Sequence, residues 1–459
     1  MKTDTIAAIA TAMAGSGIGI VRISGEEAVS ITDQIFHMPG GKKLSDMETH
    51  TIHYGHIRDG EEVIDEVMVL LMRGPRSYTR EDTVEIDCHG GVYVMKRILE
   101  TVIKYGARPA EPGEFTKHAF LNGRIDLSQA ESVIDVISAK NEFALKSSMK
   151  QLSGAVSDAV KEIRGEILHE IAFIESALDD PEHISLDGYG ERLELTIEGA
   201  VDRIEKLLAS SDNGRILKEG ISTVIVGKPN AGKSSLLNTL LGEERAIVTE
   251  IAGTTRDVLE EQINLNGIIL NIIDTAGIRD TDDIVEKIGV DKARKYVKDA
   301  DLFLYVVDAS TNLDENDGEI MELLHGRRTI VLLNKSDLTP LTTAEDIRVH
   351  VDKDCPVISI SAREQKGIDV FTEQIRKMFF RGEVTFNDEV YITNIRHKTA
   401  LQEALSSLHL VEQSIADGMP EDFYSIDLMN AYEVLGTIIG EAVEDDLVNE
   451  IFSKFCMGK

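Results

Sequence analysis

Gly227-Lys-Pro-Asn-Ala-Gly-Lys-Ser234 follows the apolar run Ser222–Val226 and precedes a leucine-rich stretch with helical spacing. Glycines at this spacing let backbone N–H groups turn inward around a phosphate, and the start of the helix adds the positive end of its dipole. Lys233 is placed to reach the β- and γ-phosphate oxygens, and the hydroxyl of Ser234 to ligate Mg²⁺. The stretch therefore predicts a P-loop. Its nucleotide-binding residues are expected to be Asn230, Ala231, Gly232, Lys233, Ser234 and Ser235.

The sequence around this loop alternates strand-like runs with helical stretches. The predicted strands are Ser222–Val226, Ile268–Ile273, Leu302–Val307, Thr329–Leu333 and Val357–Ile360. They are apolar at consecutive positions, which is typical of strands buried on both faces. We therefore expect a Ras-like domain with a doubly wound, mostly parallel sheet.

Two further segments are placed to contact the γ-phosphate and Mg²⁺. Asp274-Thr-Ala-Gly277 follows the predicted strand Ile268–Ile273, where a carboxylate holds Mg²⁺ through water and a glycine N–H contacts the γ-phosphate. Thr254 and Thr255 lie between the P-loop helix and the next strand, where a switch loop supplies a second Mg²⁺ hydroxyl, which we assign to Thr255. The expected nucleotide contacts from these segments are Thr249, Thr254, Thr255, Asp274, Thr275, Ala276 and Gly277.

Two more segments predict the identity of the base. Asn334-Lys-Ser-Asp337 follows a strand, and the carboxylate of Asp337 is suited to accept two N–H bonds from guanine. Adenine lacks the matching donors and would leave that carboxylate unpaired, which a site of this kind rejects strongly. Ser361 and Ala362 end the last strand and are expected to support the guanine oxygen through a backbone N–H. With Asn334, Lys335 and Asp337 they complete the predicted site of a GTP-hydrolysing enzyme.

One position departs from the Ras pattern. Ile278 follows Gly277 where Ras-like enzymes carry the glutamine that orients the attacking water. An isoleucine cannot polarise water, so either hydrolysis is negligible or another group takes this role. Glu286 is a candidate from the residues alone, with a solvated surface carboxylate as the alternative reading.

The pattern of apolar residues divides the rest of the chain into three further segments. Residues 1–122 carry β-type runs at Gly19–Ile23, Val67–Met72 and Thr83–Cys88 and a helical stretch near Val92–Tyr105, so they predict a mixed α/β domain. Residues 123–216 predict helices, beginning at a capping box of Ser128 and Glu131 and ending before a loop at Ser210–Gly214. The nucleotide domain then takes residues 217–380, and helix returns over 381–459.

The C-terminal helices need a partner surface. Leu401, Leu405, Leu408, Val411 and Ile415 form one apolar stripe, and a second follows after Gly418 and Pro420. We expect these helices to pack against those of residues 123–216, which makes one discontinuous helical domain with the nucleotide domain inserted in it. A separate C-terminal bundle is the alternative.

Composition limits the classes of function. The 459 residues carry 48 basic and 81 acidic side chains, a net charge of −33 that repels phosphate backbones at long range. A polyanionic substrate would therefore need a local basic patch or a basic partner. Three widely spaced cysteines fit no disulfide framework, and no apolar run approaches the roughly 20 residues that span a bilayer. We expect a cytoplasmic protein that does not insert in a membrane.

Motifs along the whole chain resemble the MnmE (TrmE) family of tRNA modification GTPases. Besides the P-loop with Asn230 and the missing glutamine, they are Gly253-Thr-Thr-Arg-Asp257 and the tail Cys456-Met-Gly-Lys459. The N-terminal matches are Gly19-Ile-Val-Arg-Ile-Ser-Gly25, Glu81-Asp82, His89-Gly-Gly91, Glu111-Pro-Gly-Glu-Phe-Thr116 and Phe120-Leu-Asn-Gly-Arg-Ile-Asp-Leu127.

The resemblance implies a homodimer that works with a flavoprotein, MnmG, to install an aminomethyl-type group on carbon 5 of the wobble uridine of certain tRNAs. It implies that the two nucleotide domains meet across K⁺, in place of an arginine finger. The implied K⁺ ligands are Asn230, Thr249, Ile251 and Thr254, and Glu286 falls at the family's catalytic glutamate. With Lys233 and Thr255, Glu286 completes the expected catalytic residues.

The family's N-terminal domain binds a formyl- or methylene-tetrahydrofolate as one-carbon donor. By motif matching, the binding residues are Arg22, Glu81, Arg124 and Lys459, and Cys456 is a possible reactive thiol. Cations suit the glutamate carboxylates of a folate, and Glu81 suits its pterin N–H groups. Two other readings of the chain stay open: a regulatory GTPase in ribosome or RNA–protein assembly, and a one-carbon transferase that GTP merely regulates.

Overall fold

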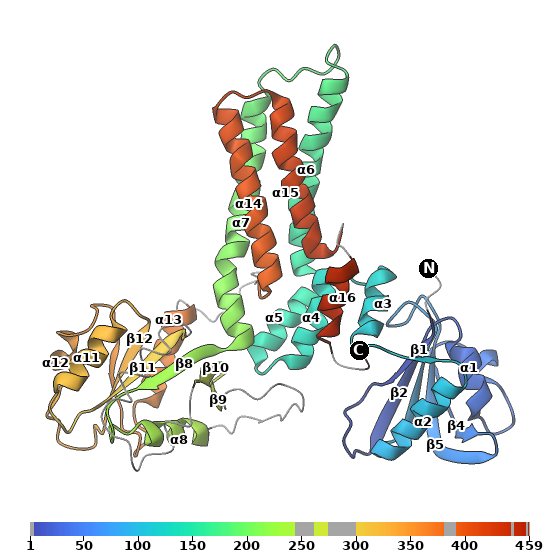
Figure 1. The fold of residues 1–459 in the computed structure, drawn as a ribbon, viewed down its shortest axis with the longest axis horizontal. Helices are drawn as coiled ribbons and strands as arrows, with labels where there is room; N and C mark the ends of the chain where they lie inside the picture. Colours follow the sequence, from blue (N-terminus) through green and yellow to red (C-terminus); the bar gives the residue numbers. More distant parts are fainter. Residues whose placement is uncertain are drawn as a thin grey trace. The chain divides into compact units, whose positions relative to one another are not determined.

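The computed structural model describes residues 4–243, 261–273, 300–380, 392–441, 445–455 and 458. The chain forms two compact units, each assembled from separated segments (Figure 1). The first contains Met1–Ser138, Ser148–Glu205 and Thr399–Lys459, and the second Ala139–Ser147 and Lys206–Lys398. The second unit is thus inserted in the sequence of the first.

The N-terminal part of the first unit is a seven-stranded sheet in the order β3-β4-β5-β6-β2-β1-β7. Its strands are β1 (Ile6–Ile9), β2 (Ile18–Ser24), β3 (Phe36–His37), β4 (Thr51–Asp59), β5 (Glu62–Met72), β6 (Thr83–His89) and β7 (Arg108–Pro109). Helices α1 (Ala28–Ile35) and α2 (Val92–Lys104) pack their apolar side chains on one face. The predicted mixed α/β domain is confirmed, including the three predicted strands, which correspond to β2, β5 and β6, and the predicted helix, which is α2.

The helical part of the first unit combines segments from both sides of the insertion. Its elements are α3 (Glu114–Leu121), α4 (Leu127–Ser138), α5 (Glu142–Leu152), α6 (Ala155–Asp179), α7 (Tyr189–Glu219), α14 (Ile395–Ala416), α15 (Glu421–Ile439) and α16 (Asp445–Ser453), of which α5, α7 and α14 continue into the second unit. Helices α6 and α15 lie side by side (Figure 1). The predicted discontinuous helical domain is therefore confirmed, and a separate C-terminal bundle is excluded.

The predicted capping box at Ser128 is wrong. Ser128 lies inside α4, and its hydroxyl donates to the Asp126 carboxylate at 2.7 Å. That carboxylate accepts from the backbone N–H of Gln129 at 3.0 Å, while the Gln129 side chain accepts from the N–H of Asp126. The reciprocal pattern of a capping box is therefore present two residues earlier, because Asp126 and Gln129 satisfy the same three-residue spacing.

The predicted loop at Ser210–Gly214 is also wrong, because α7 continues through it to Glu219. A Cβ at Gly214 would come within 2.3 Å of the Ile392 carbonyl oxygen. In addition, the Ser210 hydroxyl accepts from the Ile392 N–H at 3.1 Å. Ser210 and Gly214 therefore allow the chain at Ile392 to pack closely against α7. Serine and glycine also commonly mark turns, which is why the sequence predicted a loop here.

Arg164 joins the two sequence segments of the helical domain. Its Nε donates to the Tyr432 carbonyl at 3.0 Å, its Nη1 pairs with Glu441 at 2.6 Å, and its guanidinium lies 4.0 Å from the Tyr432 ring centre. Its side chain is only 8% exposed. The contact is close, because a Cβ at Gly436 would lie 2.9 Å from Nη2.

We expect Arg164→Ala to lower the free energy of unfolding of the helical domain by about 2–4 kcal/mol, because it removes the hydrogen bond, the ion pair and the ring stacking of a buried guanidinium. Urea unfolding followed by far-ultraviolet circular dichroism measures this. The matched control is Arg203→Ala, which removes ion pairs to Glu166 and Glu162 on a more exposed surface and should cost at most about 1 kcal/mol. Equal costs for the two variants would contradict the role of Arg164.

The second unit contains a six-stranded sheet in the order β13-β12-β11-β8-β10-β9. Its strands are β8 (Ile221–Val226), β9 (Glu261–Leu265), β10 (Ile268–Ile272), β11 (Leu302–Asp308), β12 (Thr329–Asn334) and β13 (Val357–Ser359). All neighbours pair in parallel except β9 with β10. Over the described residues from 221 to 380, the helices are α8 (Lys233–Glu243), α11 (Glu315–Leu324), α12 (Ala344–Arg348) and α13 (Ile368–Phe380).

Helices cover both faces of this sheet. Leucines of α8 and aromatic and aliphatic side chains of α13 pack on one face, and α11 and α12 pack on the other. The predicted doubly wound, mostly parallel Ras-like domain is confirmed.

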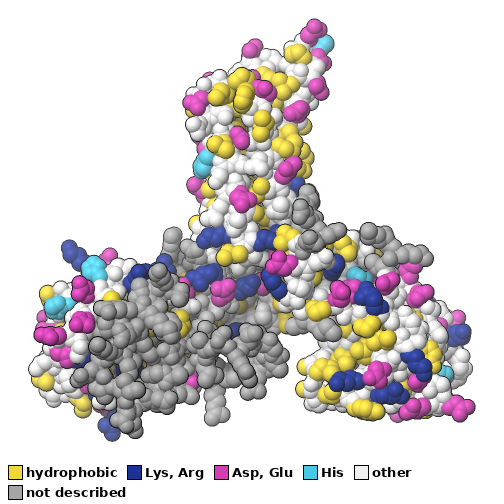
Figure 2. Space-filling model, in the orientation of Figure 1, with side chains coloured by type: hydrophobic (Ala, Val, Ile, Leu, Met, Phe, Trp, Pro, Cys, Tyr) yellow, Lys and Arg dark blue, Asp and Glu magenta, His cyan; other side chains and the backbone are white. Residues whose placement is uncertain are grey.

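Among the residues that the structure describes, no helix is long and apolar enough to cross a membrane. Acidic side chains are spread over the visible surface of the described residues (Figure 2). On that face the acidic side chains are not confined to one patch.

Candidate guanine-nucleotide site

The P-loop connects the end of β8 to the start of α8. Gly227 has φ +149°, and a Cβ there would come within 2.3 Å of the Val306 carbonyl oxygen of the neighbouring strand. Asn230 and Gly232 adopt left-handed conformations, with φ of +63° and +97°. Such backbone turns N–H groups toward the concave side of a loop, where an anion binds. Ala231 lies between these two residues, and Ser234 and Ser235 follow in the first turn of α8, whose N-terminus favours phosphate.

Lys233 lies across the loop. Its Nζ donates to the carbonyl oxygens of Gly227 and Lys228, both at 2.7 Å. The ammonium group is thus held at the P-loop by main-chain acceptors. This places it next to the predicted phosphate position.

Asn334 ties the P-loop to the loop after the last strand. Its side chain is buried, donates from Nδ2 to the Ala231 carbonyl at 2.9 Å and accepts at Oδ1 from the Ala362 N–H at 3.1 Å. A Cβ at Gly232 would come within 2.1 Å of Nδ2. The glycine is therefore required by close approach as well as by its φ.

Asp337 and Ser361 form the predicted base-recognition pair. The Ser361 hydroxyl donates to Asp337 Oδ1 at 2.7 Å, and this bond holds the pKa of the carboxyl below its usual range. Asp337 is therefore ionised at neutral pH, as an acceptor for guanine N–H groups must be. We predicted a backbone N–H contribution from Ser361 and Ala362. In the structure these N–H groups donate to the Lys366 carbonyl and to Asn334.

Lys335 has φ +63° and an ion pair that the sequence did not predict. Its Nζ lies 2.6 Å from Asp308 Oδ2, at the carboxyl end of β11. Burial raises the pKa of Asp308, but the hydrogen bonds from Lys335 and Ser310 outweigh it and leave the pKa below its usual range. A signal was present, since Asp308 is the polar residue that ends an apolar strand run on the same sheet edge.

Part of the predicted site lies outside the described residues. These positions are Thr249, Ile251, Thr254, Thr255, Asp274, Thr275, Ala276, Gly277 and Glu286, together with Cys456 and Lys459 of the tail. The contributions to Mg²⁺ of Thr255 and to K⁺ of Thr249, Ile251 and Thr254 stay predictions. Within the described ranges, no group of three or more His, Cys, Asp and Glu side chains could hold a metal ion. The predicted Mg²⁺ ligand Ser234 is a hydroxyl and does not belong to these side-chain types.

The structure also gathers three of the residues predicted to bind a folate. The guanidinium groups of Arg22 and Arg124 lie 5.6 and 4.4 Å from the ring centre of Tyr78. Arg22 Nη1 donates to the carbonyl of Gly458 at 3.1 Å, so the tail reaches this cluster. Glu81 Oε2 accepts from the Ser24 hydroxyl at 2.9 Å and lies 3.0 Å from His118 Nδ1. Sequence reasoning missed Tyr78, which has no motif signal of its own.

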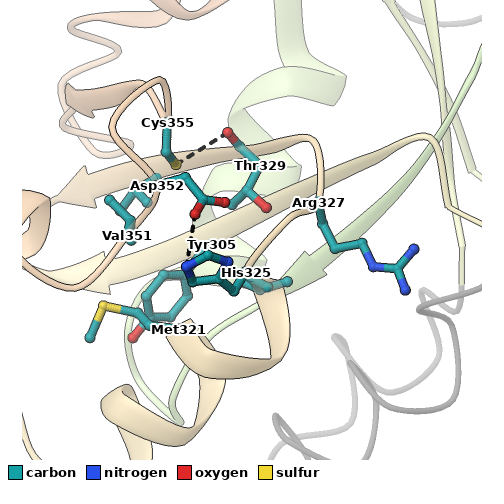
Figure 3. A pocket seen from close by; sticks show the side chains of 10 residues that line it. Tyr305, Met321, His325, Arg327, Thr329, Val351, Asp352 and Cys355 are labelled. Carbon is teal, nitrogen blue, oxygen red and sulfur yellow. Dashed lines mark hydrogen bonds and ion pairs between the residues drawn. The ribbon is translucent and has the colours of Figure 1, made fainter.

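One small cavity lies away from the nucleotide residues (Figure 3). It is lined by residues of β11, α11 and the start of β12, with Cys355 donating to the Thr329 carbonyl and His325 paired with Asp352. Thr329 begins β12, whereas Asn334 ends it. The cavity therefore lies at the amino ends of these parallel strands, whereas the P-loop lies at their carboxyl ends.

Comparison with known proteins agrees with this geometry. The family described as the MnmE helical domain matches residues 127–456, and the family described as the GTP-binding protein TrmE N-terminus matches residues 5–124. The chain is 61% identical to the tRNA modification GTPase MnmE of Lachnoclostridium phytofermentans, with 100% of both chains covered. It is 50% identical to that of Clostridioides difficile, with 99% of each covered.

A solved structure, the G domain of the T. maritima FeoB iron transporter, is 22% identical and covers 35% of this chain and 98% of its own, with a TM-score of 0.25. The P-loop, the doubly wound sheet and the Asn334–Asp337 segment define a guanine-nucleotide-hydrolysing P-loop enzyme. The chain belongs to the MnmE family of tRNA modification GTPases.

Proposed function

We propose that this chain hydrolyses GTP to drive modification of carbon 5 of the wobble uridine in certain tRNAs, in the cytoplasm, with the flavoprotein MnmG as partner and a tetrahydrofolate as one-carbon donor. The observation that carries the proposal is the P-loop with Asn334 and Asp337 inside a chain that matches tRNA modification GTPases over its full length. The group installed is of the carboxymethylaminomethyl or aminomethyl type.

Potassium dependence is part of the proposal. Asn230 lies within the P-loop in a left-handed conformation, which asparagine tolerates better than most residues. Its amide oxygen is a hard donor suited to an alkali cation beside the phosphates. The cation would supply positive charge to the transition state in place of an arginine finger, and Ser234 would provide a hydroxyl ligand to Mg²⁺.

The folate role is supported by the chemistry of the Tyr78 cluster. Arg124 beside the Tyr78 ring offers charge to carboxylates, as does Arg22, whose Nε also pairs with Glu85 at 2.7 Å, and the ring is suited to a flat heterocycle. The Glu81 carboxylate, held by Ser24 and His118, is an acceptor for pterin N–H groups. The bound folate would supply a one-carbon unit, and Arg22, Glu81, Arg124 and Lys459 would hold it.

The net charge of the chain bears on which component of the complex binds tRNA. A chain at −33 attracts a polyanion poorly at long range, so we propose that tRNA is bound largely through MnmG, by a homodimer of this chain. The alternative, a GTPase of ribosome assembly, would act on RNA or protein without changing any nucleoside.

Glu286 provides the test of this function at the site. We expect Glu286→Ala to lower GTP turnover about 100-fold, because a side chain that positions the attacking water is lost, while the dissociation constants for GTP and GDP stay within about threefold. In cells whose own copy is deleted, this allele should fail to restore the modified wobble uridine. Steady-state turnover and nucleoside analysis measure the two effects.

The matched control is Glu345→Ala, which removes an exposed carboxylate on α12. It should leave turnover and modification at the wild-type level. Wild-type turnover in Glu286→Ala would return Glu286 to a solvated surface carboxylate.

A further inference from the structure

Lys228, the second residue of the P-loop, has a side chain that leaves the loop and reaches α11. Its Nζ lies 2.6 Å from Asp317 Oδ2 and 2.8 Å from Asp314 Oδ2. The Lys228 side chain is 19% exposed and that of Asp317 only 1%. The contact is therefore a largely buried ion pair, unlike the exposed pairs that contribute little.

Asp317 is fixed independently of Lys228. Its Oδ1 accepts from the hydroxyl of Tyr305 at 2.7 Å, and Tyr305 is fully buried in β11. Its Oδ2 accepts from the N–H of Asp314 at 3.0 Å, as part of the capping box that begins α11. A buried carboxylate with these partners is a rigid anchor, because moving it would break bonds to both the sheet and the helix.

The charge state of the pair is consistent with its geometry. Burial lowers the pKa of Lys228, but the hydrogen bonds with Asp314 and Asp317 outweigh it and raise the pKa above its ordinary value. The hydrogen bond from Lys228 likewise holds the pKa of Asp314 below its usual range. Lys228 is therefore charged throughout the neutral pH range.

The backbone of Lys228 is part of the phosphate-binding loop. Its carbonyl oxygen accepts from Lys233 Nζ at 2.7 Å and from the Ala231 N–H at 3.3 Å. A residue whose main chain holds the phosphate-binding lysine and whose side chain is anchored in α11 links the two. Shifts of about 1 Å in such a loop are costly for a bound ligand.

We propose that Lys228 is a positioning residue for nucleotide binding, whose ion pairs with Asp317 and Asp314 hold the P-loop in its phosphate-binding conformation. This deepens the GTPase assignment and rests on it. The loop contacts the β-phosphate of both nucleotides, so loss of the anchor affects GDP and GTP alike.

The test compares Lys228→Met and Lys228→Arg in the full-length chain. We expect Lys228→Met to raise the dissociation constants for GDP and for GTP together by about tenfold or more, and kcat at saturating GTP to fall much less. Lys228→Arg keeps the charge and should stay within about threefold of the wild type. The control is Lys353→Met, which removes an exposed lysine of the same domain and should change nothing.

A merely structural role gives a different pattern, in which the fraction of protein that binds nucleotide falls while the dissociation constants of that fraction do not change. Unchanged constants for both nucleotides in folded Lys228→Met would overturn the proposal. If Lys228→Met fails to fold, Asp314→Asn tests the exposed arm of the pair: raised constants support the anchor, and unchanged constants refute it. Absence of GTP binding in the wild type would instead remove the GTPase assignment.

Discussion

Replacing Asp337 with asparagine is expected to weaken GTP binding by roughly 10³-fold or more and to let the site accept xanthosine triphosphate. The ionised carboxylate would accept hydrogen bonds from the two guanine N–H groups, and Ser361 holds it by donating to Oδ1 at 2.7 Å. An asparagine presents an N–H₂ group where guanine also presents donors, whereas xanthine offers a carbonyl oxygen there. Competition between GTP and xanthosine triphosphate, measured by equilibrium binding, reports the change in base preference directly.

The matched control for this change is Asp354→Asn, an exposed aspartate of the same domain. It should leave both affinities unchanged. An Asp337→Asn variant that keeps its preference for guanine would refute the assignment of the base site, whatever its turnover.

Replacing sodium with potassium at constant ionic strength is expected to raise GTP turnover by about 100-fold. The estimate follows from the size of a positive charge supplied to the phosphoryl transition state, which is worth about 10²–10⁵ in comparable sites. In the described structure the proposed ligand is Asn230, with φ +63° in the P-loop. Turnover in the two chloride salts, with nucleotide affinity measured in each, separates a catalytic effect from a binding effect.

The Asn230→Gly variant tests the proposed ligand itself. Glycine adopts this backbone conformation without strain, so the variant loses the amide side chain and keeps the loop conformation. We expect this variant to bind GTP and to lose most of the difference between the salts. Equal turnover of the wild type in sodium and potassium would contradict the cation mechanism.

Buried strands were predictable because consecutive apolar residues leave few alternatives. β8, β10, β11 and β12 fall within about a residue of their predicted ends. β9 was not predicted, because Glu261–Leu265 is an edge strand whose polar and apolar residues alternate, and it pairs antiparallel with β10. The periodicity of one short segment does not distinguish such a strand from a loop.

The residues that mark helix ends and loops were predicted less reliably, since their role depends on partners distant in the sequence. Gly214 lies within the C-terminal part of α7, where the chain at Ile392 approaches it closely, and no spacing within residues 210–214 carries that information. Similarly, Ser128 satisfied a capping pattern that Asp126 satisfies in the structure.

The nucleotide site was predictable where a motif carries the chemistry, as at Lys233, Asn334 and Asp337. The side chains that hold those motifs were not. Asp308 and Asp317 come from β11 and α11, and their pairing with Lys335 and Lys228 depends on the order of strands in the sheet. A parallel sheet brings these carboxyl-end residues together across long sequence separations.

Mass spectrometry of tRNA nucleosides from cells lacking the protein tests whether GTP hydrolysis by this chain supports modification of the wobble uridine. We predict loss of the carbon 5 aminomethyl-type group from the affected tRNAs, restored by the wild-type gene and not by Lys233→Ala. Unchanged wobble nucleosides in the deleted cells would contradict the claim.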